Sequence, residues 1–293
     1  MRAYPILALI LWLIPLAGVA ADLCATDALD RRVCLPGPAG RVVSLSPGTT
    51  ELLFSAGAGA SVLAVSAWSD YPSAARDLPR VGDSQRLDLE AIVALQPDLV
   101  VAWTDGNSRA QLDRISALGI PVFWLAPRQF QAIASAVETL GILTGHASVA
   151  RQRAARFQRE LDSLRARFGD APPVRVFYQV WDEPLMTVNG KELISKAIAL
   201  CGGVNVFADS PRLVPRVSRE AVIAADPQAI LTAGPGGDSA NGLAPWQAFP
   251  GLAAVESGNL FALTPDLLQR PTLRMLDGTR ELCQTLEVAR DHL

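Results

Sequence analysis

The stretch that decides the fold runs from Leu89 to Val101 and reads LEAIVALQPDLVV. A second stretch of the same design, REAVIAADPQAIL, begins at Arg219, which is 130 residues after Leu89. Each combines a short amphipathic helix, a proline and an apolar run typical of a buried strand. Proline ends the helix because it has no amide hydrogen to donate. Helix-proline-strand phrases also recur by chance, but this spacing indicates two similar α/β lobes with a ligand cleft between them.

Strands and helices alternate on both sides of these stretches. In the first half we predict strands at 41–45, 62–65, 99–102 and 122–125 and helices at 89–95 and 108–118. In the second half we predict strands at 174–179, 229–233 and 260–263 and helices at 191–200, 219–225 and 272–288. This alternation is typical of mostly parallel sheets.

The region from Gln129 to Phe168 has no strand pattern. Good helix formers at helical spacing, densest from Val149 to Arg167, predict one long helix with an interruption near Thr144 and Gly145. A helical connection resists bending, so we expect no large hinge closure. The predicted fold class is α/β, with two lobes that contain mostly parallel sheets and are joined by one long backbone helix. The predicted division is 1–21 signal peptide, 22–40 N-terminal hairpin, 41–127 first lobe, 128–170 linking segment and 171–293 second lobe.

The composition is that of a globular protein, with 50% hydrophobic and 19% charged residues. A net charge of -3 gives no attraction to nucleic acid or to an anionic membrane surface. Residues 1–21 combine Arg2, an apolar core and small residues at the end, which predicts a cleaved signal peptide. We therefore expect an exported protein, and we expect it to be a monomer.

Four cysteines in an exported chain suggest two disulfides. Cys24 and Cys34 flank a predicted turn and could close a small hairpin, which leaves Cys201 with Cys283. The other pairings stay open at this point. Lipid attachment at Cys24 is disfavoured because the three residues before it match a lipid-attachment box poorly.

Several further motifs occur in an order that resembles one family. They are RVVSLSP at 41–47, ALCGGVNVF at 199–207, VSRE at 217–220 and the segment 250–270. Together they resemble the periplasmic binding proteins whose two lobes are joined by a single helix and which serve importers of siderophores, haem and cobalamin. The resemblance runs from Arg41 to the C-terminus. It implies a non-enzymatic protein that binds a small molecule between its lobes and delivers it to the permease of an ABC importer.

Within this family the chain is most similar to the members that bind cobalamin, which is vitamin B12. The similarity rests on SDYP at 69–72, AWTDGN at 102–107 and the two later cysteines. It departs from them at Ser84, where an aromatic residue is expected before Gln85, and near Val214, where a tryptophan is expected. The resemblance implies cobalamin or a related corrinoid as the transported ligand. Haem or a ferric siderophore is the alternative in the same fold, and an exported α/β enzyme is the alternative from another class.

A corrinoid is a large flat disc with amide arms, so its site needs aromatic faces and hydrogen-bonding groups. Tyr71 and Trp103 are the first candidates, and Trp103 follows a predicted strand at the end where open α/β sheets bind ligands. Trp68 and Trp181 lie in adjacent predicted loops and could replace the missing aromatics. The alternative for each of the four is an ordinary half-buried structural residue, and it is weighed more heavily for Trp68 and Trp181 than for Tyr71 and Trp103. By its place in a strand, Trp124 is expected in the core.

Asp266 and Arg270 are the polar candidates. Both are predicted in the loop after the strand at 260–263, and the same strand-end argument places them at the cleft. They could bind ligand amides or pair with each other, and the alternative is an ordinary surface ion pair. The sequence does not place Trp246.

Glu90 and Glu220 stand at equivalent positions in the two repeated stretches. Negative charge is favoured at a helix start by the helix dipole, which is sufficient to explain an acid there. The resemblance implies a further role, because glutamates at this position in each lobe dock onto arginines of the permease.

The sequence offers no metal site and no catalytic constellation. It has only two histidines, His146 and His292, and His146 lies far along the chain from the aromatic candidates. The glycine-rich run 234–237 lacks the lysine and the hydroxyl residue of a phosphate-binding loop. No nucleophile-elbow motif occurs.

Overall fold

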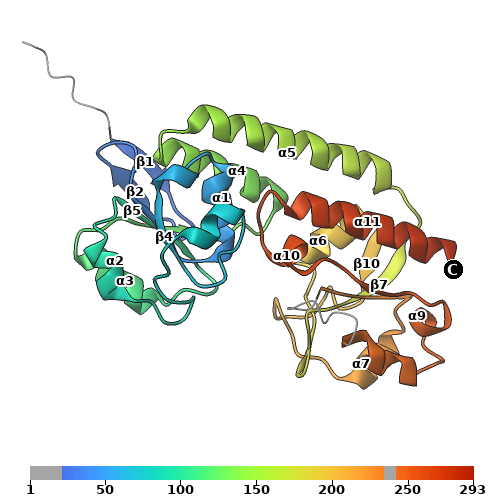
Figure 1. Ribbon diagram of the computed structural model, residues 1–293. Coiled ribbons are helices and arrows are strands. Elements are labelled where there is room, and N and C mark those ends of the chain that lie inside the picture. The colour runs from blue at the N-terminus through green and yellow to red at the C-terminus, as the bar shows by residue number, and fades with distance from the viewer. Residues whose placement is uncertain (1–21, 234–241) are drawn as a thin grey trace, which may run out of the picture.

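The computed structural model describes residues 22–233 and 242–293. The predicted signal peptide and the predicted turn at 234–237 lie outside the described residues. Two parallel four-stranded sheets form two lobes, and one long helix runs along both of them (Figure 1). Within the described ranges, no helix combines the length and the apolar character needed to cross a membrane.

The first sheet has the strand order β4-β3-β5-β6, and every neighbouring pair is parallel. Its strands are β3 (Val42–Ser44), β4 (Val62–Val65), β5 (Leu99–Trp103) and β6 (Val122–Leu125). The helices of this half are α1 (Pro47–Ser55), α2 (Leu89–Ala94) and α3 (Arg109–Ala117), with 3-10 turns η1 (Gly59–Ser61) and η2 (Ser73–Asp77). The first four residues of β5 are buried on both faces, as expected for a central parallel strand.

The second sheet has the order β10-β7-β11-β12 and is also parallel throughout. Its strands are β7 (Val174–Gln179), β10 (Gly203–Asn205), β11 (Ala229–Thr232) and β12 (Leu260–Ala262). A small hairpin, β8 (Trp181–Asp182) with β9 (Leu185–Met186), follows β7. The helices are α6 (Leu193–Leu200), α7 (Arg219–Ala225), α9 (Ala253–Glu256), α10 (Pro265–Gln269) and α11 (Met275–Asp291), with the 3-10 turn η4 (Ala244–Ala248).

The two repeated stretches form the same unit in each half, α2 before β5 and α7 before β11. Side chains cap both helices, because Asp88 accepts a hydrogen bond from the amide of Ala91 and Ser218 accepts one from the amide of Ala221. Both helices end just before the proline of the stretch. The predicted α/β class is confirmed.

The predicted interruption of the linking helix is present. The segment forms two helices, α4 (Phe130–Leu143) and α5 (Ala147–Phe168), and Gly145 between them has a positive φ of 79°. A positive φ suits glycine because it has no side chain to clash. Helix α5 packs against α4 of the first half and against α11 of the second (Figure 1).

The aromatic residues Trp124 and Trp246 both lie in the core. Trp124 is 1% exposed, which confirms its predicted place. Trp246 is equally buried, packs edge-on against Phe177 with ring centroids 5.7 Å apart, and donates its indole hydrogen to Gln179. Trp246 is thus a structural residue of the second lobe.

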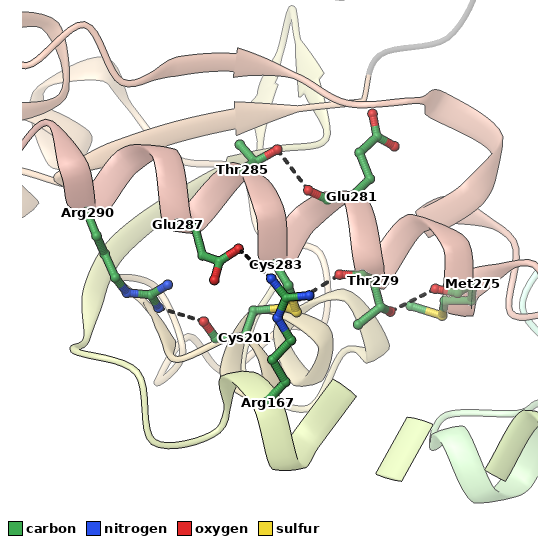
Figure 2. Close-up of a disulfide and its surroundings, with 9 residues drawn as sticks. All are labelled: Arg167, Cys201, Met275, Thr279, Glu281, Cys283, Thr285, Glu287 and Arg290. Atoms are coloured by element: carbon green, nitrogen blue, oxygen red, sulfur yellow. Dashed lines mark hydrogen bonds and ion pairs between the residues drawn. A yellow bond between two sulfur atoms is a disulfide. The ribbon is translucent and has the colours of Figure 1, made fainter. Parts of the chain in front are cut away.

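The structure joins Cys24 to Cys34 and Cys201 to Cys283. The first pair ties the antiparallel strands β1 (Leu23–Thr26) and β2 (Arg32–Leu35). The second pair joins the end of α6 to the middle of α11 and is fully buried (Figure 2). It therefore fastens the C-terminal helix to the second sheet.

Replacing Cys201 and Cys283 together by alanine is expected to lower the melting temperature clearly. The pair closes a loop of 82 residues, and a loop of that size is worth roughly 4 kcal/mol in the chain-entropy account. Thermal unfolding followed by circular dichroism measures the change. The matched variant with alanine at Cys24 and Cys34 should lose less, because its loop is shorter, and an equal loss in both variants would contradict this explanation.

Candidate functional site

A cavity opens between the two lobes at the carboxyl ends of the first sheet. Its volume, including the part open to solvent, is about 750 Å³, which is within the range of ligand pockets. The first half contributes Ser46, Pro47, Gly48, Thr49, Leu52, Trp103, Leu125 and Pro127, and the second contributes Asp266, Gln269, Arg270 and Pro271. Three of the six predicted ligand residues, Trp103, Asp266 and Arg270, therefore share one cavity.

A smaller hollow extends this cavity toward α6. The two share Trp103, Pro127, Gln269 and Pro271. The extension adds the charged residues Asp105, Arg128 and Glu192. Arg128 pairs with Asp105 at 2.7 Å, and the ammonium of Lys196 donates to the Arg128 carbonyl at 2.8 Å. The combined cleft has an aromatic wall and polar ends.

The wall formed by α1 is shaped by its cap. Ser46 accepts a hydrogen bond from the amide of Thr49, and the Thr49 hydroxyl accepts one from the amide of Ser46. This reciprocal arrangement fixes the first turn of the helix, as in a capping box. The segment from Ser46 to Thr49 is therefore held rigidly against the cavity.

Trp103 ends β5, and two neighbours hold it in place. Its backbone amide donates to the side chain of Asn107 at 2.8 Å, and Asn107 in turn donates to the Leu45 carbonyl. Its ring lies so close to Gly106 that a Cβ added there would stand 2.3 Å from ring atoms. Gly106 therefore permits the position that the indole takes at the cavity wall.

Changing Gly106 to alanine is expected to weaken ligand binding several-fold, because the added methyl group displaces the Trp103 ring from the cavity wall. The overall fold should be retained, since the rest of the turn is held by Asn107. The dissociation constants of the variant and of the wild-type protein are compared by titrating each with the ligand, and indole fluorescence serves as a second signal. Unchanged affinity in a folded variant would show that the ring position is unimportant.

Asp266 is not in a loop, which corrects the sequence prediction for this residue, whereas Arg270 follows the helix as its C-terminal cap. Asp266 lies in the first turn of the short helix α10, and Arg270 is the residue that ends it. The sequence Thr264-Pro265-Asp266 is a recognisable helix start, because proline is favoured in the first turn. One turn of helix brings the two side chains together, and their charged atoms are 3.3 Å apart.

Arg270 also reaches across to the first lobe. Its guanidinium lies 3.0 Å from Glu51 and 2.7 Å from Asp70. Burial opposes the charge on Arg270, but hydrogen bonds to Asp70 and Glu51 outweigh it, so the pKa of Arg270 is raised. At Asp70 burial is likewise outweighed, by the hydrogen bond and charge of Arg270, and the pKa of Asp70 is lowered. Arg270 and Asp70 therefore stay ionised at neutral pH.

Glu51 is a central residue that the sequence analysis missed. It lies in α1, is 2% exposed and accepts hydrogen bonds from Arg270, Thr272 and Arg274 of the second lobe. One signal was available, because Glu51 is the only charged residue in the segment PGTTELLFS. An acidic side chain that is buried with an apolar helix requires hydrogen-bonding partners, but the sequence alone does not say where they are. We call Glu51, Asp70, Asp266, Arg270, Thr272 and Arg274 the inter-lobe cluster.

The other aromatic candidates lie outside the cavity. Tyr71 is 45% exposed and stacks under Arg274, whose guanidinium carbon is 3.9 Å from the ring centroid. It borders a separate hollow against α5. Trp68 is 80% exposed, and Trp181, in β8, donates its indole hydrogen to the Glu183 carbonyl. Of the four, only Trp103 is among the described residues that line the cavity.

Glu90 and Glu220 occupy the first turns of α2 and α7, and both are exposed. The two helices lie on the side of the molecule away from α5 (Figure 1). Hydrogen bonds from its own backbone amide and from Ser218 lower the pKa of Glu220. Each lobe therefore presents one exposed acidic side chain on the same side of the molecule.

His146 precedes α5 and lies 3.3 Å from the Thr144 hydroxyl. It is not among the residues that line the cavity. In the parts of the chain that the structure describes, no group of three or more histidine, cysteine, aspartate or glutamate side chains is arranged to hold a metal ion.

Comparison with known proteins places this geometry in a family. The sequence pattern of the family described as Periplasmic binding protein matches residues 42–267. The Vitamin B12-binding protein of Yersinia pestis (strain Pestoides F) is 40% identical over 277 residues, which cover 94% of this chain and 95% of the relative. The crystal structure of the periplasmic Vitamin B12 binding protein BtuF of Vibrio cholerae matches with a TM-score of 0.80 and 37% identity, over 87% of this chain and 99% of that one.

The periplasmic heme-binding protein RhuT from Roseiflexus sp. RS-1, in apo form, is more distant. It matches with a TM-score of 0.75 and 25% identity, over 85% of this chain and 98% of that one. The fold, the cleft between two lobes and the family match over most of the sequence agree. This chain therefore belongs to the periplasmic binding protein family.

Proposed function

We propose that this protein captures cobalamin or a related corrinoid between its two lobes in the periplasm and delivers it to an ABC importer, without catalysing a reaction. The observation that carries the proposal is the cleft in which Trp103 faces a polar wall formed by Asp266, Gln269 and Arg270. An aromatic face with hydrogen-bonding groups at its edge suits a flat ring with amide arms. The names of the relatives, which match nearly the whole chain, support the same ligand class.

The charges at the cleft favour a corrinoid over an anionic ligand. Arg270 and Arg274 contact three carboxylates, those of Glu51, Asp70 and Asp266. Their positive charge is thus already balanced within the protein. A ferric siderophore or the propionates of haem would have to compete with these internal acids, whereas the amide groups of a corrinoid can donate to the half-exposed Asp266 at the cavity wall.

We assign roles within this proposal as follows. Trp103 stacks on the ring, Asp266 and Arg270 bind polar arms, and Tyr71, Trp68 and Trp181 contact the parts of the ligand that extend beyond the cavity. The division into a first lobe at 41–127, a linking segment at 128–170 and a second lobe at 171–293 belongs to the same proposal.

The proposal also covers how the protein is exported and how it delivers its ligand to the importer. Residues 1–21 act as a cleaved signal peptide, and the mature protein is a periplasmic monomer. Glu90 and Glu220 dock onto arginines of the permease, and their presentation by α2 and α7 on one side of the molecule suits a two-fold symmetric partner.

The ligand is tested by mixing the purified protein with cyanocobalamin, haemin or a ferric siderophore, desalting it and recording its absorption spectrum. We expect cyanocobalamin to remain bound at one molecule per protein, and calorimetry to give the same ratio with and without EDTA. Retention of haemin or the siderophore instead would identify that compound as the ligand class in place of the corrinoid. Absence of heat with every cobalamin and cobinamide form would reject the corrinoid.

A further inference from the structure

We infer that Glu51 is a positioning residue for ligand capture, which holds Arg270 at the cleft and keeps the two lobes at one separation. As a statement about ligand capture, the inference rests on the proposed function. It concerns a residue that does not line the cavity itself, so its effect must pass through Arg270 and through the position of α1.

Within residues 22–233 and 242–293, the three side chains that donate to Glu51 all come from the other lobe. One carboxylate oxygen accepts from Arg270 at 3.0 Å and Arg274 at 3.1 Å, and the other accepts from the Thr272 hydroxyl at 2.9 Å. The partners are 219 to 223 residues away along the chain. Both oxygens of one buried acid are thus used to join α1 to the segment between α10 and α11.

Burial separates Glu51 from the other acids around Arg270. Its side chain is 2% exposed, whereas those of Asp70 and Asp266 are 45% and 46% exposed. The exposed acids can turn to water or to a ligand. Glu51 is enclosed at the contact, and its three described donors reach it only while the lobes are together, so separation of the lobes would break all three hydrogen bonds. Glu51 is therefore the fixed end of the contact, and Asp70 and Asp266 are the ends that a ligand can engage.

The position of Glu51 connects this contact to the cavity wall. Pro47, Gly48, Thr49 and Leu52 of the same helix line the cavity, and Arg270 lines it from the opposite lobe. A displacement of α1 relative to Arg270 would change the width of the site. At the far end of the cleft the ammonium of Lys196 donates to the Arg128 carbonyl, which gives a second and weaker attachment. A cleft held in this way does not lose binding free energy to lobe ordering.

The first test uses no ligand. In the variant Glu51→Gln, the amide keeps the size of the side chain, but it removes the charge and turns an NH₂ group toward the guanidiniums or toward Thr272. Spin labels at Ser116→Cys in α3 and Ala224→Cys in α7, both exposed positions in different lobes, report the distance distribution by electron paramagnetic resonance. We expect Glu51→Gln to broaden or shift this distribution.

The matched control is Asp27→Asn. Asp27 is also a buried acid, 5% exposed, and it pairs with Arg31 at 2.8 Å, but both residues lie in the N-terminal hairpin region. The control should lower the melting temperature and leave the distance distribution and the affinity unchanged. An unchanged distribution in Glu51→Gln would overturn the inference, whatever the ligand proves to be.

The second test measures cyanocobalamin binding. We expect Glu51→Gln to raise the dissociation constant about tenfold, mainly through slower association. The reason is that a smaller fraction of the protein has the lobes at the binding separation. The double variant Glu51→Gln with Arg270→Gln should lose less affinity than the sum of the two single losses, since part of the effect of Glu51 passes through Arg270. Additive losses, or a lower melting temperature with unchanged affinity, would contradict a positioning role.

Two further outcomes stay distinguishable. If wild-type protein does not bind cyanocobalamin, the proposed function fails, while the distance measurement still decides whether Glu51 fixes the lobes. If Glu51→Gln does not fold, Thr272→Val removes only the hydrogen bond to the second oxygen. That variant should shift the distance distribution and the affinity in the same direction by a smaller amount, and no shift would reject the inference.

Discussion

Replacing Glu90 and Glu220 together by alanine is expected to reduce uptake through the cognate importer at least tenfold, with ligand affinity within about threefold of wild type. Both acids are exposed, lie in first helical turns and stand apart from the cavity residues. Truncating one partner of a desolvated charge pair costs about 2–5 kcal/mol, partly because the other charge is left unpaired. Loss of one such contact in each lobe should therefore disrupt docking while capture remains normal.

Uptake by reconstituted transporter in vesicles, with ligand binding measured separately, tests this expectation. The matched control removes two other exposed acids, Asp162 in α5 and Asp291 in α11, which lie away from α2 and α7. Each single glutamate change should be milder than the double change, and reversal to lysine should be worse because of direct repulsion. Normal uptake by the double alanine variant would reject the docking role and leave both residues as acids that stabilise the start of a helix.

Replacing Trp103 by alanine is expected to weaken corrinoid binding by about 1–3 kcal/mol, the usual loss for a large buried aromatic contact. Trp103 is the one aromatic among the predicted ligand residues that lines the cavity, and it lines both the main cavity and its extension. Its backbone contacts to Asn107 do not depend on the indole. The fold of the turn should therefore survive the change.

Calorimetry with cyanocobalamin measures this loss. Trp103→Phe should recover a substantial part of the affinity because it keeps an aromatic face, and Tyr71→Ala should cost less than Trp103→Ala because Tyr71 lies outside the cavity against Arg274. Equal affinity of Trp103→Ala and wild type would indicate that the ring of the ligand stacks on the exposed aromatics Tyr71, Trp68 and Trp181 instead.

Local signals in the sequence were sufficient for most of the regular structure. The helix-proline-strand stretches predicted α2 with β5 and α7 with β11, and the strands at 62–65, 122–125 and 174–179 were predicted with their observed bounds. Apolar runs, caps and prolines act on neighbouring residues, so their effect can be read from a short window. The same holds for the break at Gly145, where the backbone needs a residue that accepts a positive φ.

Short elements with weak patterns were missed. Strand β10 has three residues, and its middle residue, Val204, is half exposed at the edge of the sheet. Its pairing with β7 gives it strand geometry, and no alternation of apolar residues marks it. Helix α10 is similarly short, and it places Asp266 in its first turn and Arg270 at its C-terminal cap.

The sequence by itself determined the α/β class, the two-lobe repeat and the placement of Trp103, Asp266 and Arg270 at strand ends that face a cleft. Only the tertiary structure decided which side chains meet there. Glu51 joins Arg270 across 219 residues of chain, and Tyr71 lies under Arg274 outside the cavity. Such contacts depend on how two separately folded sheets are set against each other by α4, α5 and α11, and no local pattern of residues encodes that relation.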